Sequence, residues 1–123
     1  MSYVERKSIA ITTIADGSAT GYVEIDQGRL SQIRYAKTDY ADGVDFAITL
    51  EATGEVVWTG TNVNASVTIA PRQATHDVLG AASLYAAAGE PVEDYIAIAK
   101  DRIKIVIAQG GDSKTGTFHF VMV

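Results

Sequence analysis

The stretch that decides the fold reads Arg102-Ile-Lys-Ile-Val-Ile-Ala108, then a glycine-containing polar loop, then Gly116-Thr-Phe-His-Phe-Val-Met-Val123. Apolar side chains occupy every second position in both segments. This period of two places them on one face of a strand, and the loop between the segments indicates a turn. The stretch therefore predicts a hairpin, and its inward side chains are expected in the core: Ile103, Ile105, Ile107, Phe118 and Phe120.

The rest of the chain repeats this pattern. Further strands are expected at residues 7–14, 21–27, 30–36, 44–51, 55–59, 63–70 and 95–99. Turn signals separate them, among them Gln27-Gly28 and Lys100-Asp101. Spacing of about 8–12 residues between turns is typical of sandwiches and barrels. The sequence predicts an all-β protein, an antiparallel β-sandwich of jelly-roll-like form, with the strand order open between a jelly roll and a simpler sandwich.

One segment departs from this rhythm. Residues 71–89 run from Pro71 through an alanine-rich stretch, the best helix-forming composition in the chain. Thr75 or Asp77 could cap a short helix, although Gly80 disfavours it. We expect one short helical excursion around residues 74–88, serving as a crossover or as a docking surface.

Composition bounds the class of protein. The 123 residues are expected to form one domain, residues 1–123, and 47% apolar with 20% charged residues is typical of a globular chain. The net charge of −5 has no basic stripe, which disfavours nucleic-acid binding. No apolar run is long enough for a membrane span, so no membrane partner is expected. The chain has no cysteine, which excludes disulfides and thiolate chemistry.

Candidate catalytic and metal-binding residues are few. His76, Asp77 and Ser83 are the residue types of a nucleophilic triad. However, adjacent side chains point apart, and no nucleophile-elbow sequence surrounds the serine. No histidine or carboxylate pair has metal-ligand spacing. The sequence predicts no enzyme, no cofactor and no metal.

Aromatic residues leave one other class of function open. Trp58 and the tyrosines Tyr35, Tyr40, Tyr85 and Tyr95 could line a sugar-binding surface, with Trp58 and Tyr40 on one concave face, because jelly rolls often serve as lectins. Core packing also explains these aromatic residues. A carbohydrate-binding β-sandwich module therefore stands as an alternative.

Four segments carry a family resemblance: Pro71–Asp77, Gly80–Ala86, Asp101–Gly111 and Lys114–Phe120. With these segments the chain resembles small structural proteins of tailed bacteriophages, of the kind encoded beside the major capsid protein. The likeness covers roughly residues 70–123. It rests on turns and strands and contains no catalytic motif.

The resemblance implies a virion protein of the cement (decoration) type, which binds the outside of the capsid and bridges capsomers. The implied partners are the major capsid protein and neighbouring copies, as a dimer or trimer. The implied location is the capsid exterior, after synthesis in the host bacterial cytoplasm. A head-tail adaptor, neck or tail component is the nearest alternative. The residues expected at interfaces are Tyr3, Val4, Arg72, His76, Leu84, Tyr85, Val121 and Val123.

Overall fold

The computed structural model describes residues 4–123, and it is built from β-strands and turns. The strands are β1 (Glu5–Thr12), β2 (Ala19–Lys37), β3 (Val44–Leu50), β4 (Val56–Val63), β5 (Val67–Ile69), β6 (Gln73–Ala74), β7 (Glu93–Asp94), β8 (Ile96–Ala108) and β9 (Thr115–Met122). The all-β prediction is therefore confirmed for the described residues.

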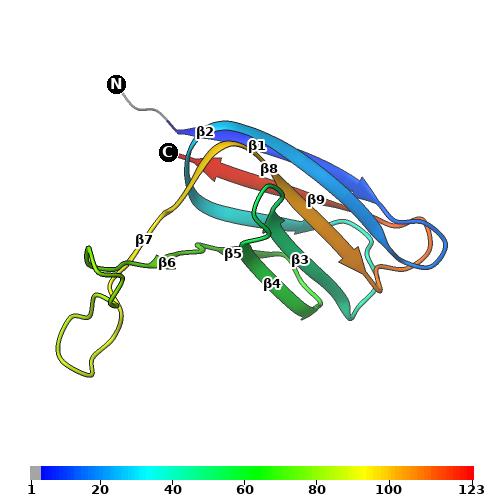
Figure 1. Ribbon diagram of the computed structural model, residues 1–123. Helices are drawn as coiled ribbons and strands as arrows, with labels where there is room; N and C mark the ends of the chain where they lie inside the picture. The colour runs from blue at the N-terminus through cyan, green and yellow to red at the C-terminus, as the bar shows by residue number, and fades with distance from the viewer. Residues whose placement is uncertain (1–3) are drawn as a thin grey trace.

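Seven of the strands form one antiparallel sheet in the order β1-β9-β2-β8-β3-β4, with β5 paired to β2. The sheet curls around its core as a half-barrel (Figure 1). Strand β2 causes the curl because it serves both halves of the sheet. Its first part pairs with β8 up to Leu30, and its second part pairs with β9 from Leu30 onward.

The predicted closing hairpin is wrong in its pairing, although both of its strands exist. β8 pairs with β2 and β3, and β9 pairs with β1 and β2, so β2 lies between the two strands that were expected to pair. The loop between β8 and β9 thus steps across the end of one strand. Alternating apolar residues specify a strand and its buried face, but they do not specify its neighbour.

Two predicted turns are also wrong. Gln27-Gly28 lies inside β2, where Gly28 adopts φ 146° and the strand bends without ending. Lys100-Asp101 lies inside β8, where Lys100 adopts φ 47° as an irregularity in the ladder with β2. A glycine or a positive φ inside a strand marks a bulge or a bend as readily as a turn.

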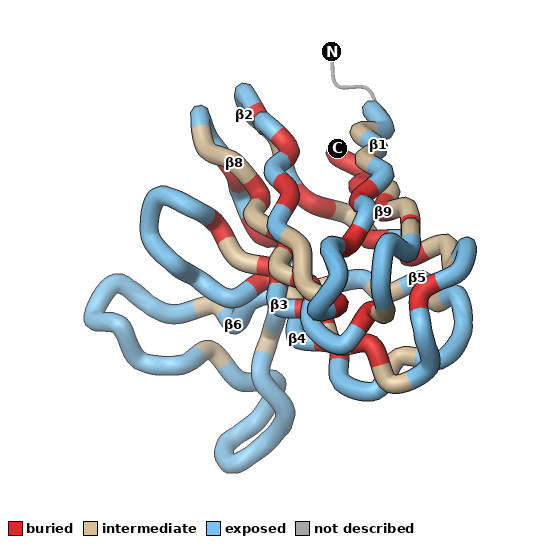
Figure 2. The backbone as a smooth tube through the Cα atoms, turned by 90° about the vertical axis from the view of Figure 1, so that its right-hand side faces the viewer, coloured by how far each residue is buried: buried red, intermediate tan, exposed pale blue. Residues whose placement is uncertain are grey.

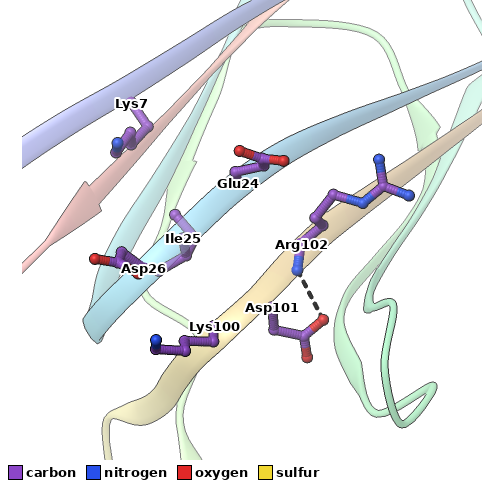
Figure 3. A pocket seen from close by; sticks show the side chains of 7 residues that line it. All are labelled: Lys7, Glu24, Ile25, Asp26, Lys100, Asp101 and Arg102. Carbon is purple, nitrogen blue, oxygen red and sulfur yellow. Dashed lines mark hydrogen bonds between the residues drawn. The ribbon is translucent and has the colours of Figure 1, made fainter.

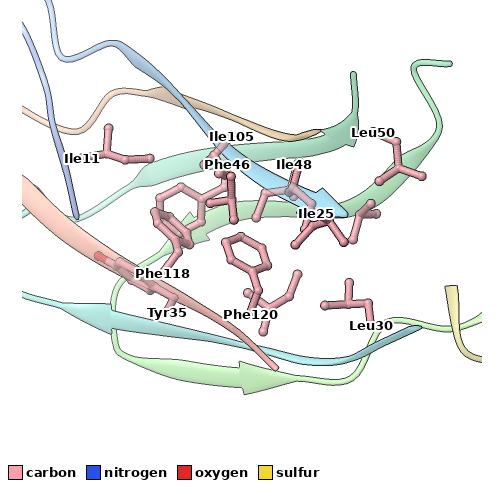
Figure 4. Close-up of a cluster of buried hydrophobic side chains, with 14 of the residues drawn as sticks. Ile11, Ile25, Leu30, Tyr35, Phe46, Ile48, Leu50, Ile105, Phe118 and Phe120 are labelled. Atoms are coloured by element: carbon pink, nitrogen blue, oxygen red, sulfur yellow. The ribbon is translucent and has the colours of Figure 1, made fainter. Parts of the chain in front are cut away.

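The core lies inside the curl and is centred on aromatic side chains (Figure 4). Tyr35 packs against Phe118 with ring centroids 5.3 Å apart, and Phe46 meets Phe118 edge to face at 4.9 Å. Tyr40 closes the cluster and donates a hydrogen bond from its hydroxyl to the carbonyl of Ile11 at 2.6 Å. The predicted core residues of β8 and β9 are confirmed, since each is fully buried: Ile103, Ile105, Ile107, Phe118 and Phe120.

Loops at one end of the sheet are joined by hydrogen bonds. The hydroxyl of Thr13, in the β1–β2 loop, donates to the carbonyl of Gly111 in the β8–β9 loop and accepts the amide of Lys114 at 2.9 Å. The amide of Gly110 donates to the carbonyl of Gly17 at 2.9 Å. These bonds join the β1–β2 loop, which passes the end of β9, to the β8–β9 loop, which passes the end of β2.

The predicted helical excursion around residues 74–88 is wrong. That segment contains β6, turns and isolated bridges, and it extends away from the sheet (Figure 1). The buried positions lie in the sheet, whereas the chain along this extension is exposed (Figure 2). A short helix in a protein is stabilised mainly by packing one face, and this segment extends away from the sheet, so the helix propensity of its alanines does not suffice.

Candidate docking arm

Residues 73–94 form an arm that leaves the sheet after β5 and returns to it at β8 (Figure 1). Its two sides are β6 and β7, which pair through Gln73 with Asp94 and through Ala74 with Glu93. No residue of the arm is buried, and its exposed position makes it the candidate functional site.

The root of the arm is a stack of charged and aromatic groups. The guanidinium carbon of Arg72 lies 4.3 Å from the ring centre of Tyr95, and that of Arg29 lies 5.0 Å from it. Arg72 also donates hydrogen bonds to the carbonyls of Ser31, at 3.0 Å, and Pro71, at 2.8 Å. Cation–π contacts of this kind are worth about 0.5–1 kcal/mol each at exposed sites. They connect the two ends of the arm to β2.

Beyond β6 and β7 the arm divides into two loops at a three-way junction. The amide of Thr75 donates to Val92, that of Val92 donates to Ser83, and that of Ser83 donates to Thr75, each to the carbonyl at 2.9 Å. The hydroxyl of Thr75 adds a second bond to the Val92 carbonyl at 2.8 Å. The junction closes a first loop at residues 76–82 and a second loop at residues 84–91.

Each loop has its own internal hydrogen bonds. In the first loop, the carboxylate of Asp77 accepts the amides of Leu79, at 2.9 Å, and Ala81, at 3.0 Å. Gly80 adopts φ 84°, which a residue with a side chain rarely adopts. In the second loop, the amide of Tyr85 donates to the carbonyl of Glu90 at 3.0 Å. The backbone of both loops is therefore specified although neither packs on the core.

Large apolar side chains on these loops face solvent. Val78 and Leu79 of the first loop are 101% and 90% exposed, and Tyr85 and Leu84 of the second are 76% and 42% exposed. The arm also carries Asp77, Glu90, Glu93 and Asp94, and residues 73–94 contain no lysine or arginine. A hydrogen-bonded backbone that presents apolar side chains to water is typical of a surface that binds a partner.

The structure does not assemble the candidate triad. The carboxylate of Asp77 is bonded to backbone amides, and the backbone of Ser83 lies in the three-way junction. His76 lies exposed on the first loop, bridged through its backbone to Ala82. No hydrogen bond among residues 4–123 joins any two of these three side chains. Asp77 thus has a structural role in the first loop.

The residues expected at interfaces lie in several places. Leu84, Tyr85 and His76 are on the loops of the arm, and Arg72 is at its root. Val4 is 66% exposed at the beginning of the described chain, and Tyr3 lies outside the described residues.

The end of the chain is covered by the sheet itself. Val121 is buried inside β9, between β1 and β2. Val123 is partly buried and exchanges backbone hydrogen bonds with Arg29, at 2.8 and 2.9 Å. Val121 and Val123 were expected at an interface, and strands β1 and β2 of the same chain cover this apolar end.

Of the aromatic residues that suggested a sugar-binding surface, Tyr35, Tyr40 and Trp58 belong to the core, whereas Tyr85 lies on the second loop of the arm and Tyr95 at its root. Tyr40 is buried, and Trp58 is partly buried with its ring centroid 5.7 Å from that of Phe46. They do not form an exposed aromatic face together.

A pocket of about 310 Å³ opens between β1, β2 and β8 (Figure 3). It is lined by Ile25 and six charged residues, three basic and three acidic: Lys7, Lys100, Arg102, Glu24, Asp26 and Asp101. Three of these groups are already engaged, since Lys7 pairs with Glu5 at 3.1 Å, Arg102 is bound by Glu51, and Asp101 accepts the amide of Ala52 at 3.0 Å. Opposite charges that balance one another in this way do not indicate a ligand of either sign.

Among the described residues, no group of three or more histidine, aspartate or glutamate side chains could hold a metal ion. Nor does any helix of that part of the chain have the length and apolarity to cross a membrane.

No known family model matches the chain, and no curated protein matches it significantly.

Sequence reasoning missed the most exposed apolar pair, Val78 and Leu79, because it assigned this segment to a helix. The signal that could have found the first loop is Asp77 followed by Gly80, since aspartate bonds to backbone amides two or more residues ahead and glycine permits positive φ. The role of Tyr95 at the root of the arm was also missed. Its contacts join segments far apart in the sequence, and no local pattern indicates them.

Proposed function

We propose that the protein is a non-enzymatic bacteriophage cement (decoration) protein, which binds the outer surface of the head and bridges capsomers. Its partners on this proposal are the major capsid protein and neighbouring copies of itself. The proposal starts from the resemblance of residues 70–123 to small phage structural proteins. The observation that carries it is the arm, with Val78 and Leu79 held in water by a hydrogen-bonded backbone.

The arm suits a protein that must attach at many equivalent places. Complete burial of a valine or leucine side chain contributes about 1.5–3 kcal/mol, so the first loop alone would give a weak contact. A shell offers the same site many times, and linked copies convert weak contacts into strong attachment. The preformed loops reduce the conformational entropy lost on binding.

The curled sheet suits the rigid body of such a protein. We propose that its two halves correspond to the two sheets of a jelly-roll-like β-sandwich, joined through the bend of β2. The support is that Tyr35, in the second part of β2, and Phe118 of β9 both pack against Phe46 of β3 across the aromatic core. An experimental structure with two separable sheets would agree with this description.

The test is sedimentation with phage heads. We expect the wild-type protein to sediment with heads and the variant Val78→Ser/Leu79→Ser to remain in the supernatant. The matched control is Val56→Ser, because Val56 is 66% exposed on β4 but lies on the body, and this variant should sediment like the wild type. Equal sedimentation of the arm variant and the control would contradict docking through the arm.

The number of copies on each head distinguishes a cement protein from a head-tail adaptor, neck or tail protein. Hundreds of copies on each head would support a cement protein. About six or twelve copies would favour the head-tail adaptor, neck or tail alternative, since those positions lie on a single axis of the particle. Absence of the protein from purified particles would contradict both.

A further inference from the structure

The outer face of β1, β9, β5 and the second part of β2, from Gln32 onward, carries basic groups and no carboxylate. Strand register places Arg6 in one row with Val121 and Gln32, and Ser8 in the next row with His119, Arg34 and Thr68. The neighbouring residues of the opposite parity, such as Phe118, Phe120 and Tyr35, point into the core. We call this surface the arginine face, defined by Arg6, Arg34 and His119.

Hydrogen bonds join neighbouring side chains across the arginine face. The side chains of Ser8 and His119 hydrogen-bond at 2.8 Å, and Arg34 donates to the hydroxyl of Thr68 at 3.2 Å. Arg6 and Arg34 are both exposed. The face therefore presents two guanidinium groups at the surface of a protein whose net charge is −5.

The arm has the opposite character. Its four carboxylates, from Asp77, Glu90, Glu93 and Asp94, all belong to exposed residues, and no lysine or arginine lies among residues 73–94. Three of the four lie on the second loop or on β7. The carboxylate of Asp77 is the exception, because it is bonded inside the first loop.

A second observation concerns tyrosine. Tyr22 and Tyr95, at the described surface, are each covered by arginine: Arg102 lies 4.1 Å from the ring centre of Tyr22, and Arg72 lies 4.3 Å from that of Tyr95. Within residues 4–123, Tyr85 is exposed with no guanidinium over its ring. It lies on the second loop, beside Glu90.

The arm cannot bring these groups to the arginine face of its own chain, because both loops lie at the end of the arm that is remote from the sheet (Figures 1 and 2). A second copy of the chain offers the same face to them. The carboxylates of the arm are opposite in charge to the guanidinium groups of the arginine face, and the exposed tyrosine can stack on an arginine. The two surfaces are therefore complementary in charge and in the side-chain contacts that they can make.

We propose that the second loop and β7 of one copy dock on the arginine face of a neighbouring copy. Glu90 and Glu93 then pair with Arg6 and Arg34, and the Tyr85 ring stacks on a guanidinium. The contact joins two different surfaces, so it is heterologous, and repetition closes a ring or extends a chain of copies. The first loop remains free to bind the shell, and in this respect the inference rests on the proposed function.

Charge reversal tests this contact in the purified protein. One variant, Arg6→Glu/Arg34→Glu, makes the face acidic, and the other, Glu90→Lys/Glu93→Lys, makes the arm basic. Sedimentation velocity should show a concentration-dependent oligomer for the wild type. For each variant alone, we expect self-association to weaken by roughly tenfold or more, because like charges then oppose each other. An equimolar mixture of the two variants should associate again, since each arm then meets a face of opposite charge.

The controls separate this inference from the proposed function. Val78→Ser/Leu79→Ser should keep the oligomer while losing attachment to heads, and Tyr85→Ala should weaken the oligomer. Circular dichroism checks that each variant is folded. A wild type that stays monomeric at its highest soluble concentration would overturn the contact even if the protein sediments with heads. So would an unchanged oligomer in both charge variants, or an arginine face that binds duplex DNA in place of a second copy.

Discussion

The guanidinium carbon of Arg72 lies 4.3 Å from the ring centre of Tyr95, and these two residues flank the arm on either side. Their contact fixes the arm to the body at the point where both of its strands leave the sheet. Arg29, from the bend of β2, lies over the same ring. Tyr95 is therefore a shared contact for both arginines at the root of the arm.

Replacing that tyrosine tests the role of this shared contact. Tyr95→Ala should loosen the arm, so that amide hydrogen exchange and proteolysis increase across residues 73–94 while the sheet is unaffected. Tyr95→Phe keeps the ring over which both arginines lie, and it should behave like the wild type. Exchange measured by mass spectrometry gives the result for each peptide. Equal protection of the arm in the alanine variant and the wild type would show that β6 and β7 suffice.

Two tyrosines in the core give a matched pair with opposite expected effects. The hydroxyl of Tyr35 is buried and has no hydrogen-bond partner among the described residues, whereas that of Tyr40 donates to Ile11. Tyr35→Phe removes an unpaired polar group and should raise the free energy of unfolding by roughly 1 kcal/mol, and Tyr40→Phe should lower it by a similar amount. Urea denaturation at neutral pH measures both. A loss of stability in the Tyr35 variant would mean that its hydroxyl is bonded in solution.

The same two residues predict sensitivity to alkaline pH. Burial raises the pKa of Tyr35 from its ordinary value of 10.0 to about 12, and burial, followed by the neighbouring Tyr35, raises the pKa of Tyr40 as well. Because the folded protein holds the neutral phenols, their contribution is complete below pH 10. It is lost as the pH rises from 10 through the raised pKa values, since the unfolded chain ionises first.

Alkaline denaturation followed by the ultraviolet absorbance of tyrosinate tests this expectation. In the wild type, the signal of the buried tyrosines should appear together with unfolding. The double variant Tyr35→Phe/Tyr40→Phe should lose less stability between pH 10 and 12 than the wild type does. An identical pH dependence in both proteins would contradict the assignment.

Gly116, in β9, is the place where the core is least able to accept an added atom. A Cβ at this position would overlap the ring of Tyr40, which is itself held by its hydrogen bond to Ile11. Gly116→Ala should therefore destabilise the protein by about 1–3 kcal/mol, the usual cost of overpacking. The double variant Gly116→Ala/Tyr40→Leu, which removes the overlapping ring, serves as the control. If the alanine costs as much without the ring as with it, steric overlap is not the cause.

The strands could be predicted from the sequence because their pattern is local. Alternation across Val44–Leu50 and Ile103–Ile107 gives the buried face directly, and the structure agrees. Strand partners could not be predicted in the same way. Whether β9 pairs with β8 or enters between β1 and β2 depends on packing among Phe118, Phe46 and Tyr35, which are far apart in the sequence.

The candidate site was predictable only in outline. Pro71 and the change of composition after it correctly indicate a segment distinct from the sheet. Its conformation was not predictable from helix propensity, because Asp77 and Gly80 favour a turn where alanine favours a helix. The sequence was sufficient to name Leu84 and Tyr85 as interface residues, but it did not show that they lie on an arm. The exposure of Val78 and Leu79 became apparent only in the structure.

The position of β9 between β1 and β2 also bears on how the chain reaches this fold. Glu5 pairs with Met122 and Thr12 with Thr115, so segments separated by about a hundred residues must meet before that part of the sheet exists. Closing such long loops costs conformational entropy before any contact offsets it. We therefore expect refolding on the slow scale of sheet proteins, milliseconds to seconds, with the hairpin of β3 and β4 forming early and β9 entering last.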